Sequence, residues 1–252
     1  MSPVVSLSAS PRNRLLALLP AEEFGRLREH LSPVFLTAGE AIYDSGLPAD
    51  WIYFPTTAVV SFVHTAESGA TTQVGLVGNE GVLGLAVLLG AKSLPDGAIV
   101  QIAGEALRSR GEVVAAEFWR AGTFQHLLLR YLQALMTQIS QTAACNQMHS
   151  VEQRLCRWLL LCLDRVESDE LTMTQEVLAG MLGDRRESVT LAAGNLQSLG
   201  LIQYARGRVA VLDRAGLEAM ACECYKIVRT EIAQLLSQAP RGPGPSPIAL
   251  DR

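Results

Sequence analysis

Residues 172–197 read TMTQEVLAGMLGDRRESVTLAAGNLQ, and this stretch decides the fold of the C-terminal third of the chain. Thr174 is suited to cap the start of a helix, and Gly183 supplies the left-handed conformation that ends it. The apolar positions of this first helix are Val177, Leu178, Met181 and Leu182. A second helix begins three residues after the glycine, and its inward positions are Val189, Ala192, Ala193 and Leu196. Two short amphipathic helices joined by a tight glycine turn are typical of a helix-turn-helix.

The start of the second helix carries the side chains that this layout would bring to DNA, because that end of the helix enters the major groove. Arginine pairs bidentately with guanine, glutamate accepts from cytosine, and hydroxyls donate to phosphates or base edges. We therefore predict DNA contacts from residues at the starts of both helices, namely Thr174, Arg185, Arg186, Glu187, Ser188 and Thr190.

A two-stranded wing is predicted directly after the second helix, which Gly200 ends. Residues 201–204 and 209–212 are rich in apolar side chains and flank a short turn that contains Arg206 and Arg208. Arginines at the tip of such a hairpin suit phosphate oxygens. The alternative for the whole stretch is a helical hairpin with a purely structural role.

The overall charge counts against a nucleic-acid partner, because DNA-binding domains usually carry a basic face. The chain of 252 residues has a formal net charge of −4. Between Asp184 and Arg208, however, four arginines stand against two acidic residues, a local net charge of +2. The basic residues are thus concentrated where a helix-turn-helix needs them.

The first half of the chain has a different sequence pattern. Residues 12–31 predict two short helices, separated at Pro20. From Val34 to about Arg110, short apolar runs alternate with turns that contain glycine or proline; the runs are 41–43, 51–54, 59–63, 73–77, 98–102 and 105–108. Many short strands with turns every ~8–12 residues predict an antiparallel sandwich or barrel.

A long helix is predicted over residues 124–146, where apolar residues recur at spacings of four and three, as in a coiled-coil seam. At 1.5 Å per residue this helix would be roughly 35 Å long, longer than one side of a small barrel needs. We predict that it forms a homodimer interface through Leu128, Leu132, Leu135 and Ile139. The alternative is a core helix that packs on its own domain.

Composition and chain ends narrow the class of protein further. Apolar residues make up 49% of the chain, which suits a globular core, and no apolar run approaches the ~18–20 residues that span a bilayer. The first ten residues lack the basic start and apolar centre of a secretion signal. We therefore predict a cytoplasmic protein with no membrane partner.

All five cysteines lie in the C-terminal half, at Cys145, Cys156, Cys162, Cys222 and Cys224. Their odd number in a chain without an export signal predicts reduced, mostly apolar core residues. The single-residue spacing between the last two is closer than in common zinc half-sites. A redox or metal role is the alternative, and the prediction is that the chain holds no metal.

With these elements the chain resembles the Crp/Fnr family of bacterial transcription regulators. The motifs that carry the resemblance are residues 171–179, Leu182-Gly183, residues 186–189, residues 199–202 and residues 206–208, with Gly39-Glu40 and Gly81-x-x-Gly84-Leu85 in the N-terminal half. The resemblance covers roughly residues 12–236 and implies an α+β fold: an antiparallel β-jelly-roll sensor domain, a long dimerisation helix and a C-terminal winged helix-turn-helix.

These parts predict a cyclic-nucleotide-binding-like β-barrel over 12–120, a dimerisation helix over 121–149, a DNA-binding domain over 150–236 and a disordered tail over 237–252. The tail prediction rests on its content of proline and glycine. The resemblance implies a homodimer on a pseudo-palindromic operator, with double-stranded DNA, a second copy of the chain and RNA polymerase as partners. We expect no cofactor and no enzymatic activity, because no Ser/His/Asp set or phosphate-binding loop can be proposed from the sequence.

Arg186 and Glu187 correspond to the family's base-reading pair. The family often has another arginine four residues after the glutamate, where this chain has Leu191. We therefore expect an operator that departs from the common family site. Arg185 is a candidate to compensate.

The sensor pocket departs more from the family pattern. Members that bind cyclic AMP use a glutamate and a later arginine, where this chain has Val82 and, around residues 94–98, Asp96 without an arginine. A carboxylate repels a phosphate, so control by cyclic AMP is not expected. Candidate effector-pocket residues are Gly81, Val82, Gly84, Leu85 and Asp96; the alternative is that residues 78–85 are simply a glycine-rich turn.

The sequence gives little support for an iron–sulfur cluster or for a metal-dependent enzyme. The chain has no cysteine before Cys145, which excludes the N-terminal iron–sulfur cluster of some family members on ligand count. A metal-dependent enzyme on a similar barrel would need several histidines, and His64 is the only one between the N-terminal helices and the long helix. The competing class is a signalling adaptor that uses the barrel as an interaction module and does not bind DNA.

Overall fold

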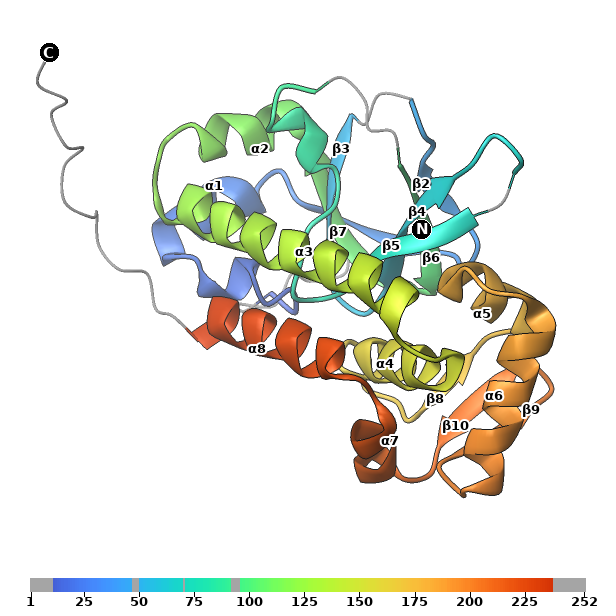
Figure 1. Ribbon diagram of the computed structural model, residues 1–252. Helices are drawn as coiled ribbons and strands as arrows, with labels where there is room; N and C mark the ends of the chain where they lie inside the picture. Colours follow the sequence, from blue (N-terminus) through green and yellow to red (C-terminus); the bar gives the residue numbers. More distant parts are fainter. Residues whose placement is uncertain (1–10, 47–49, 70, 92–95, 238–252) are drawn as a thin grey trace, which may run out of the picture.

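The computed structural model describes residues 11–46, 50–69, 71–91 and 96–237, so the predicted tail lies almost wholly outside the described residues. Its N-terminal part contains two antiparallel sheets (Figure 1). One sheet has the order β1 (Ser32–Leu36), β7 (Gly104–Arg110), β3 (Trp51–Pro55). The other has the order β2 (Ala41–Tyr43), β6 (Gly97–Ile102), β4 (Val59–Thr65), β5 (Thr71–Val77).

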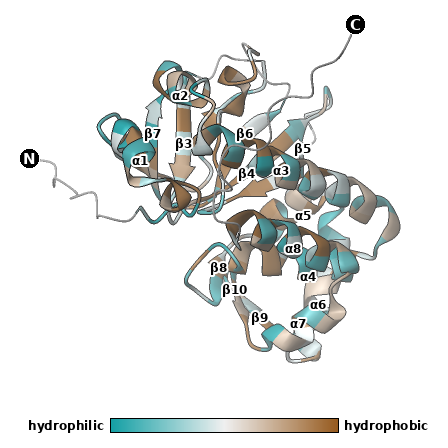
Figure 2. Ribbon diagram, turned by 90° about the vertical axis from the view of Figure 1, so that its left-hand side faces the viewer, coloured by the Kyte–Doolittle hydropathy of each residue, from teal (hydrophilic) through white to brown (hydrophobic). Residues whose placement is uncertain are grey.

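All six predicted apolar runs are strands, and their side chains form a common core. Ile52, Phe54 and Val60 are completely buried between the sheets. In Figure 2 the strands β3 and β4 are mainly hydrophobic, whereas helix α1 at the surface is mainly hydrophilic. Strand β1 was not among the predicted runs, because its sequence SPVFL begins with a serine and a proline. Proline is tolerated there because β1 is an edge strand of its sheet.

Short helices close the open sides of the barrel. They are η1 (Leu16–Leu18), α1 (Ala21–Arg28), η2 (Leu85–Val87) and α2 (Gly111–Phe118). The two short helices predicted within residues 12–31 are η1 and α1. Helix α1 is joined to α2 by Arg26, whose guanidinium donates to Glu117 at 2.7 and 2.9 Å.

The long helix α3 (Thr123–Met148) crosses the barrel and lies beside α8 (Glu223–Ser237), which returns from the far end of the chain (Figure 1). One face of α3 packs into the barrel core through Phe124, Leu128 and Tyr131. A second face lies against α8. Within the described residues no helix combines the length and apolar character that a membrane crossing requires.

The C-terminal part starts at α4 (Val151–Leu163), where Ser150 and Gln153 form a reciprocal capping box. It continues through β8 (Glu170–Thr172), α5 (Gln175–Leu182), α6 (Arg186–Ser198), β9 (Ile202–Ala205), β10 (Arg208–Val211) and α7 (Arg214–Met220). This order confirms the predicted fold class: an N-terminal antiparallel β-domain, a long helix and a C-terminal helix-turn-helix with a wing.

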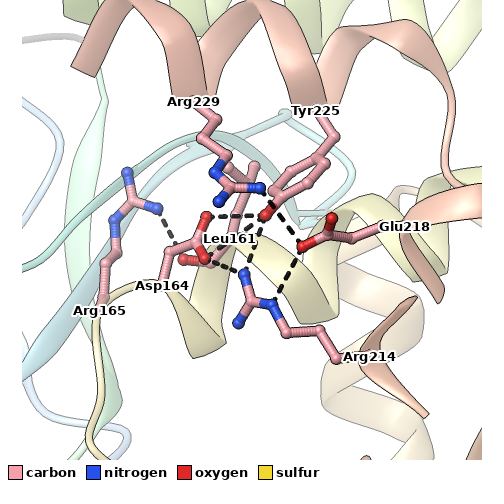
Figure 3. Close-up of polar contacts among 7 residues, drawn as sticks. All are labelled: Leu161, Asp164, Arg165, Arg214, Glu218, Tyr225 and Arg229. Atoms are coloured by element: carbon pink, nitrogen blue, oxygen red, sulfur yellow. Dashed lines mark hydrogen bonds and ion pairs between the residues drawn. The ribbon is translucent and has the colours of Figure 1, made fainter. Parts of the chain in front are cut away.

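A polar network fixes α7 and α8 on the end of α4 (Figure 3). The Tyr225 hydroxyl donates to the Asp164 carboxylate at 3.1 Å, and the Arg214 guanidinium also donates to that carboxylate. Arg214 donates to Glu218 at 3.0 Å, and Arg229 donates to the same glutamate at 3.3 Å. Asp164 is therefore the shared acceptor that connects three helices.

Replacing Asp164 with asparagine is expected to lower the stability of the chain, because the Arg214 guanidinium loses its charged partner. Hydrogen bonds to charged groups contribute about 1.5–3 kcal/mol, and partial exposure of this pair reduces the loss to about 1–2 kcal/mol. That corresponds to a fall in Tm of roughly 2–8 °C. The control is Glu22→Gln, since that carboxylate pairs with Arg26 at the surface with 89% of its side chain exposed. Equal Tm values for the two variants would contradict this role of Asp164.

Candidate nucleic-acid interface

The first helix of the motif starts and stops where the sequence predicts. The Thr174 side chain accepts a hydrogen bond from the backbone N–H of Val177 at 3.3 Å and so caps α5. Gly183 ends the helix with φ +61° and ψ +39°, a left-handed conformation that glycine adopts without steric cost. Leu178, Met181 and Leu182 are buried, whereas Val177 is 39% exposed.

Arg154 of α4 holds the turn between the two helices. Its guanidinium donates to the Leu182 carbonyl at 3.0 Å and to the Asp184 carboxylate, and the arginine is only 6% exposed. Burial raises the pKa of Asp184, but hydrogen bonds from the Arg185 backbone and from Arg154 outweigh burial and lower it. The carboxylate is therefore ionised at neutral pH and fixes the start of the second helix.

The second helix, α6, buries one face and exposes the other. Its buried residues are the four that the sequence predicts: Val189, Ala192, Ala193 and Leu196. The helix begins at Arg186, three residues after Gly183 as predicted, and Arg185 is its N-cap residue. Arg185, Arg186, Glu187 and Thr190 are exposed, and Ser188 is half-buried.

Two of the predicted contact residues have partners on α5. The Thr190 hydroxyl lies 3.0 Å from Oε1 of Gln175 and 2.8 Å from the Arg186 carbonyl. The Arg186 guanidinium lies 3.8 Å from the Glu176 carboxylate, with 62% and 78% of the two side chains exposed. An exposed ion pair of this kind is worth little, so the guanidinium is free to exchange it for a stronger partner.

Leu191 is 66% exposed on the outer side of α6. A large apolar side chain in this position gains nothing from the core of its own chain. It has the chemistry to contact the methyl group of a thymine in the major groove. This chain thus has an exposed apolar side chain where the common family pattern has an arginine.

The wing is a three-stranded sheet of order β8-β10-β9. Ala205 pairs with Arg208, so the turn consists of Arg206 and Gly207, with φ +52° and +75°. A two-residue hairpin turn with positive φ at both positions is the type I′ turn, in which glycine, asparagine and aspartate are preferred. The Arg208 guanidinium lies 3.3 Å from Glu170 of β8, and both arginines are exposed. Strand β8 was not predicted, because it is only three residues long.

Strand β5 and the turn after it connect the barrel with the C-terminal domain. The Trp158 indole N–H donates to Gln73 at 2.6 Å, and Arg165 donates to the buried Glu80 at 2.8 Å. A Cβ on Gly183 would lie 2.7 Å from the Thr72 hydroxyl oxygen, so the turn of the motif is packed closely on β5. Beside this contact lies a cleft of about 1290 Å³, lined among others by His64, Gln101, Thr174, Arg185 and Arg186.

The candidate effector-pocket residues lie in a packed segment. Val82 is completely buried and Leu85 is 7% exposed, and a Cβ on Gly84 would lie 2.5 Å from the Trp51 carbonyl oxygen. The Gly81 N–H donates to the Gly78 carbonyl at 3.1 Å, so that amide is already used. Residues 81–85 thus form a closely packed turn. Asp96 is engaged at 2.9 Å by Nδ1 of His64.

The predicted seam of α3 needs a correction. Leu128 is 1% exposed inside the barrel core, and Leu132 and Leu135 pack against that core. Ile139 is 38% exposed, and its side chain lies near Gly75 of β5. Leu128 and Leu135 therefore face the chain's own barrel, as the core-helix alternative requires.

The comparisons with known proteins agree with this geometry. Residues 153–220 match the family model of the Crp-like helix-turn-helix domain. No curated protein matches the chain by sequence. Among solved structures, a CRP-family transcriptional regulator of Thermus thermophilus is 25% identical, with a TM-score of 0.62 over 75% of this chain and 96% of that one.

Two further structures show the same fold. FixK2 of Bradyrhizobium japonicum is 15% identical, with a TM-score of 0.66 over 76% of this chain and 98% of that one. The c-di-GMP-responsive global regulator CLP of Xanthomonas campestris is 16% identical, with a TM-score of 0.63 over 77% of this chain and 100% of that one. The resemblance predicted from the sequence is confirmed for the fold: the chain has the fold of Crp/Fnr-family regulators, and residues 153–220 match a Crp-like helix-turn-helix domain.

Proposed function

We propose that this protein binds operator DNA as a homodimer and thereby regulates transcription. The observation that carries the proposal is the exposed start of α6, where Arg186 and Glu187 project from a helix whose other face is buried. Arg185, Ser188 and Thr190 lie beside them, and Thr174 is at the start of α5. Arg186 is suited to a guanine and Glu187 to a cytosine, so together they read base edges in the major groove.

The wing supports the same function through the backbone of Arg206. An arginine with positive φ costs about 1–3 kcal/mol where a glycine or asparagine would cost little. Such strain persists where the side chain has a use, and a guanidinium at a wing tip binds the phosphate backbone. Arg206 and Arg208 therefore position the domain on the duplex while α6 reads it.

The dimer surface that we propose is the exposed stripe of α3. Leu129 and Met136 are 50% and 63% exposed, and Ile139 is 38% exposed. With Leu132, which is half-buried and also packs against the barrel core, these residues recur at spacings of three, four and three, which is the pattern of a coiled-coil seam. The seam is thus displaced from the one predicted by sequence, with Leu129 and Met136 in place of Leu128 and Leu135.

Cyclic AMP is not the controlling ligand in this proposal. The position that would need a cation has Asp96, whose carboxylate repels a cyclic phosphate. RNA polymerase is the further partner that we propose, because a regulator bound at a promoter acts on the polymerase there. The adaptor alternative does not explain why the arginines gather at the two DNA-contacting ends of one motif.

The proposal is tested by selecting bound fragments from a library of random duplexes with the purified full-length chain. We expect enrichment of a pseudo-palindrome whose half-sites lie about one helical turn apart, because a twofold dimer presents its two α6 helices at that spacing. An adaptor would enrich no sequence.

Replacing both wing arginines, Arg206→Ala with Arg208→Ala, is expected to weaken binding to all duplexes alike. A dimer would lose up to four phosphate contacts, so the slope of log K against log salt concentration becomes less steep by about 3–4. The slope is measured by titrating the selected duplex at several salt concentrations. The control pair is Arg120→Ala with Arg229→Ala, which removes equal charge far from the wing; an unchanged slope in the wing variant would refute the phosphate contacts.

A further inference from the structure

Three cysteines and a histidine that are far apart in the sequence meet at the junction of α3 and α8. Cys145 is in the last turns of α3, and His149 is the residue that caps this helix. Cys222 precedes α8, and Cys224 lies in its first turn. One potential ligand atom from each of the four residues lies within 4.8 Å of all the others.

We propose that these four residues bind a zinc ion. The Sγ atoms of Cys145 and Cys222 are 3.5 Å apart, and Sγ of Cys224 is 3.7 Å from Nδ1 of His149. With Zn–S bonds of about 2.3 Å and Zn–N bonds of about 2.0–2.1 Å, a tetrahedral site has S···S edges of about 3.8 Å and S···N edges of about 3.6 Å. Two of the six edges of a site with three sulfur ligands and one nitrogen thus already have nearly the tetrahedral length, and the other four are at most 4.8 Å.

The orientation of His149 fits a ligand. Its Nδ1 points toward Cys224, and its Nε2 lies 3.3 Å from the Glu223 carboxylate. Histidines that bind metals usually donate their other ring N–H to a carboxylate or carbonyl, which fixes the tautomer and makes the ligand nitrogen more basic. Glu223 stands in that outer position, and it belongs to the same short segment as the two cysteines.

Burial indicates a structural rather than a catalytic metal. Cys145, Cys222 and Cys224 are at most 3% exposed, and the histidine side chain is 14% exposed. Four protein ligands in a closed site leave no position for water or substrate, which is typical of structural zinc. The ion would fasten the end of the long helix to the start of α8.

A buried arginine provides the charge that such a site needs. Three thiolates, a neutral histidine and Zn²⁺ have a net charge of −1. Arg157 is 6% exposed, forms no ion pair with any residue that the structure describes, and donates only to the Thr142 hydroxyl among the bonds found there. The hydrogen bond with Cys222 and burial raise the pKa of Cys145, and burial raises the pKa of Cys224; the positive charge of Arg157 opposes both shifts. A zinc–thiolate centre would give this guanidinium its counter-charge.

The test is elemental analysis of the full-length protein, expressed with zinc in the medium and purified without a metal-affinity tag. We expect about one zinc per protomer in the wild type and less than a tenth of that in Cys222→Ala. The matched control is Cys162→Ala, which removes a completely buried thiol outside the cluster and should keep its zinc. Zinc retained by Cys222→Ala would overturn the proposal.

A second measurement does not depend on the folding of a variant. Cobalt added to the metal-free wild type should produce the near-ultraviolet charge-transfer bands and strong visible bands of a tetrahedral thiolate site, and zinc should remove them. A wild type that contains no stoichiometric zinc and develops no such bands contradicts the proposal. So does a protein that contains an iron–sulfur cluster, or one that mass spectrometry shows with a Cys145–Cys222 disulfide.

Discussion

Arg186→Ala should abolish selective operator binding while leaving the weak affinity for bulk DNA. A bidentate arginine–guanine pair is worth about 1–3 kcal/mol of discrimination, and a dimer loses two of them. The expected loss of specific affinity is therefore about 30-fold to 10,000-fold. It is measured by titrating the selected duplex and an unrelated duplex with each protein at one salt concentration.

The matched control is Arg120→Ala, because the Arg120 and Arg186 side chains are 61% and 62% exposed and each has a carboxylate neighbour. The control removes the same charge from the same chain but lies on the barrel side of the molecule. It should bind the operator like the wild type. Equal losses of operator affinity in both variants would mean that Arg186 contributes only general charge. No loss of affinity in either variant would show that Arg186 does not contact the operator.

The second large effect is expected from Leu129→Asp combined with Met136→Asp. Both side chains are exposed in the single chain, so their replacement leaves the barrel core intact, but it puts four carboxylates into the proposed dimer seam. We expect a monomer by light scattering. Because a monomer contacts one half-site instead of two, its operator affinity should fall by at least about 100-fold.

Leu89→Asp serves as the control, since Leu89 is also exposed, at 58%, but lies outside α3. This variant should stay dimeric. A dimer that survives the double substitution at Leu129 and Met136 would show that another surface joins the protomers. A wild type that is itself monomeric at micromolar concentration would contradict the proposed homodimer.

The helix-turn-helix could be predicted in detail because its signals are local. A threonine cap, a glycine with positive φ and a buried face of four residues each follow from a few neighbouring positions. The fold of the barrel was also predictable, since each strand is a short apolar run between turns. Two strands were not predicted. Strand β1 of the barrel contains a proline, and strand β8 beside the wing has only three residues.

The register of α3 could not be predicted from spacing alone. Leu127, Leu128 and Leu129 are consecutive, so a seam of alternating fours and threes can be drawn through more than one of them. Which stripe faces the barrel depends on β5 and on α8, and both are distant in sequence. The packing of α8 along α3 was not predicted either, and it is this packing that leaves a separate stripe exposed.

The cluster of Cys145, His149, Cys222 and Cys224 was not predicted from the sequence for a related reason. The pair Cys222 and Cys224 is closer than a usual zinc half-site, and His149 had no evident partner in the sequence. The signal that was present is the spacing of four between Cys145 and His149, which brings two ligands to one side of a helix end. It becomes meaningful only once α8 returns to that end.

The central claim is that two copies of α6 read one duplex together, and its most direct measurement compares three duplexes at fixed salt: the selected operator, the same duplex with one half-site scrambled, and a fully scrambled one. We predict that the intact operator is bound at least about 1,000-fold more tightly than the scrambled duplex, with the half-operator between them. Affinities that agree within about threefold for all three duplexes would contradict base reading by α6.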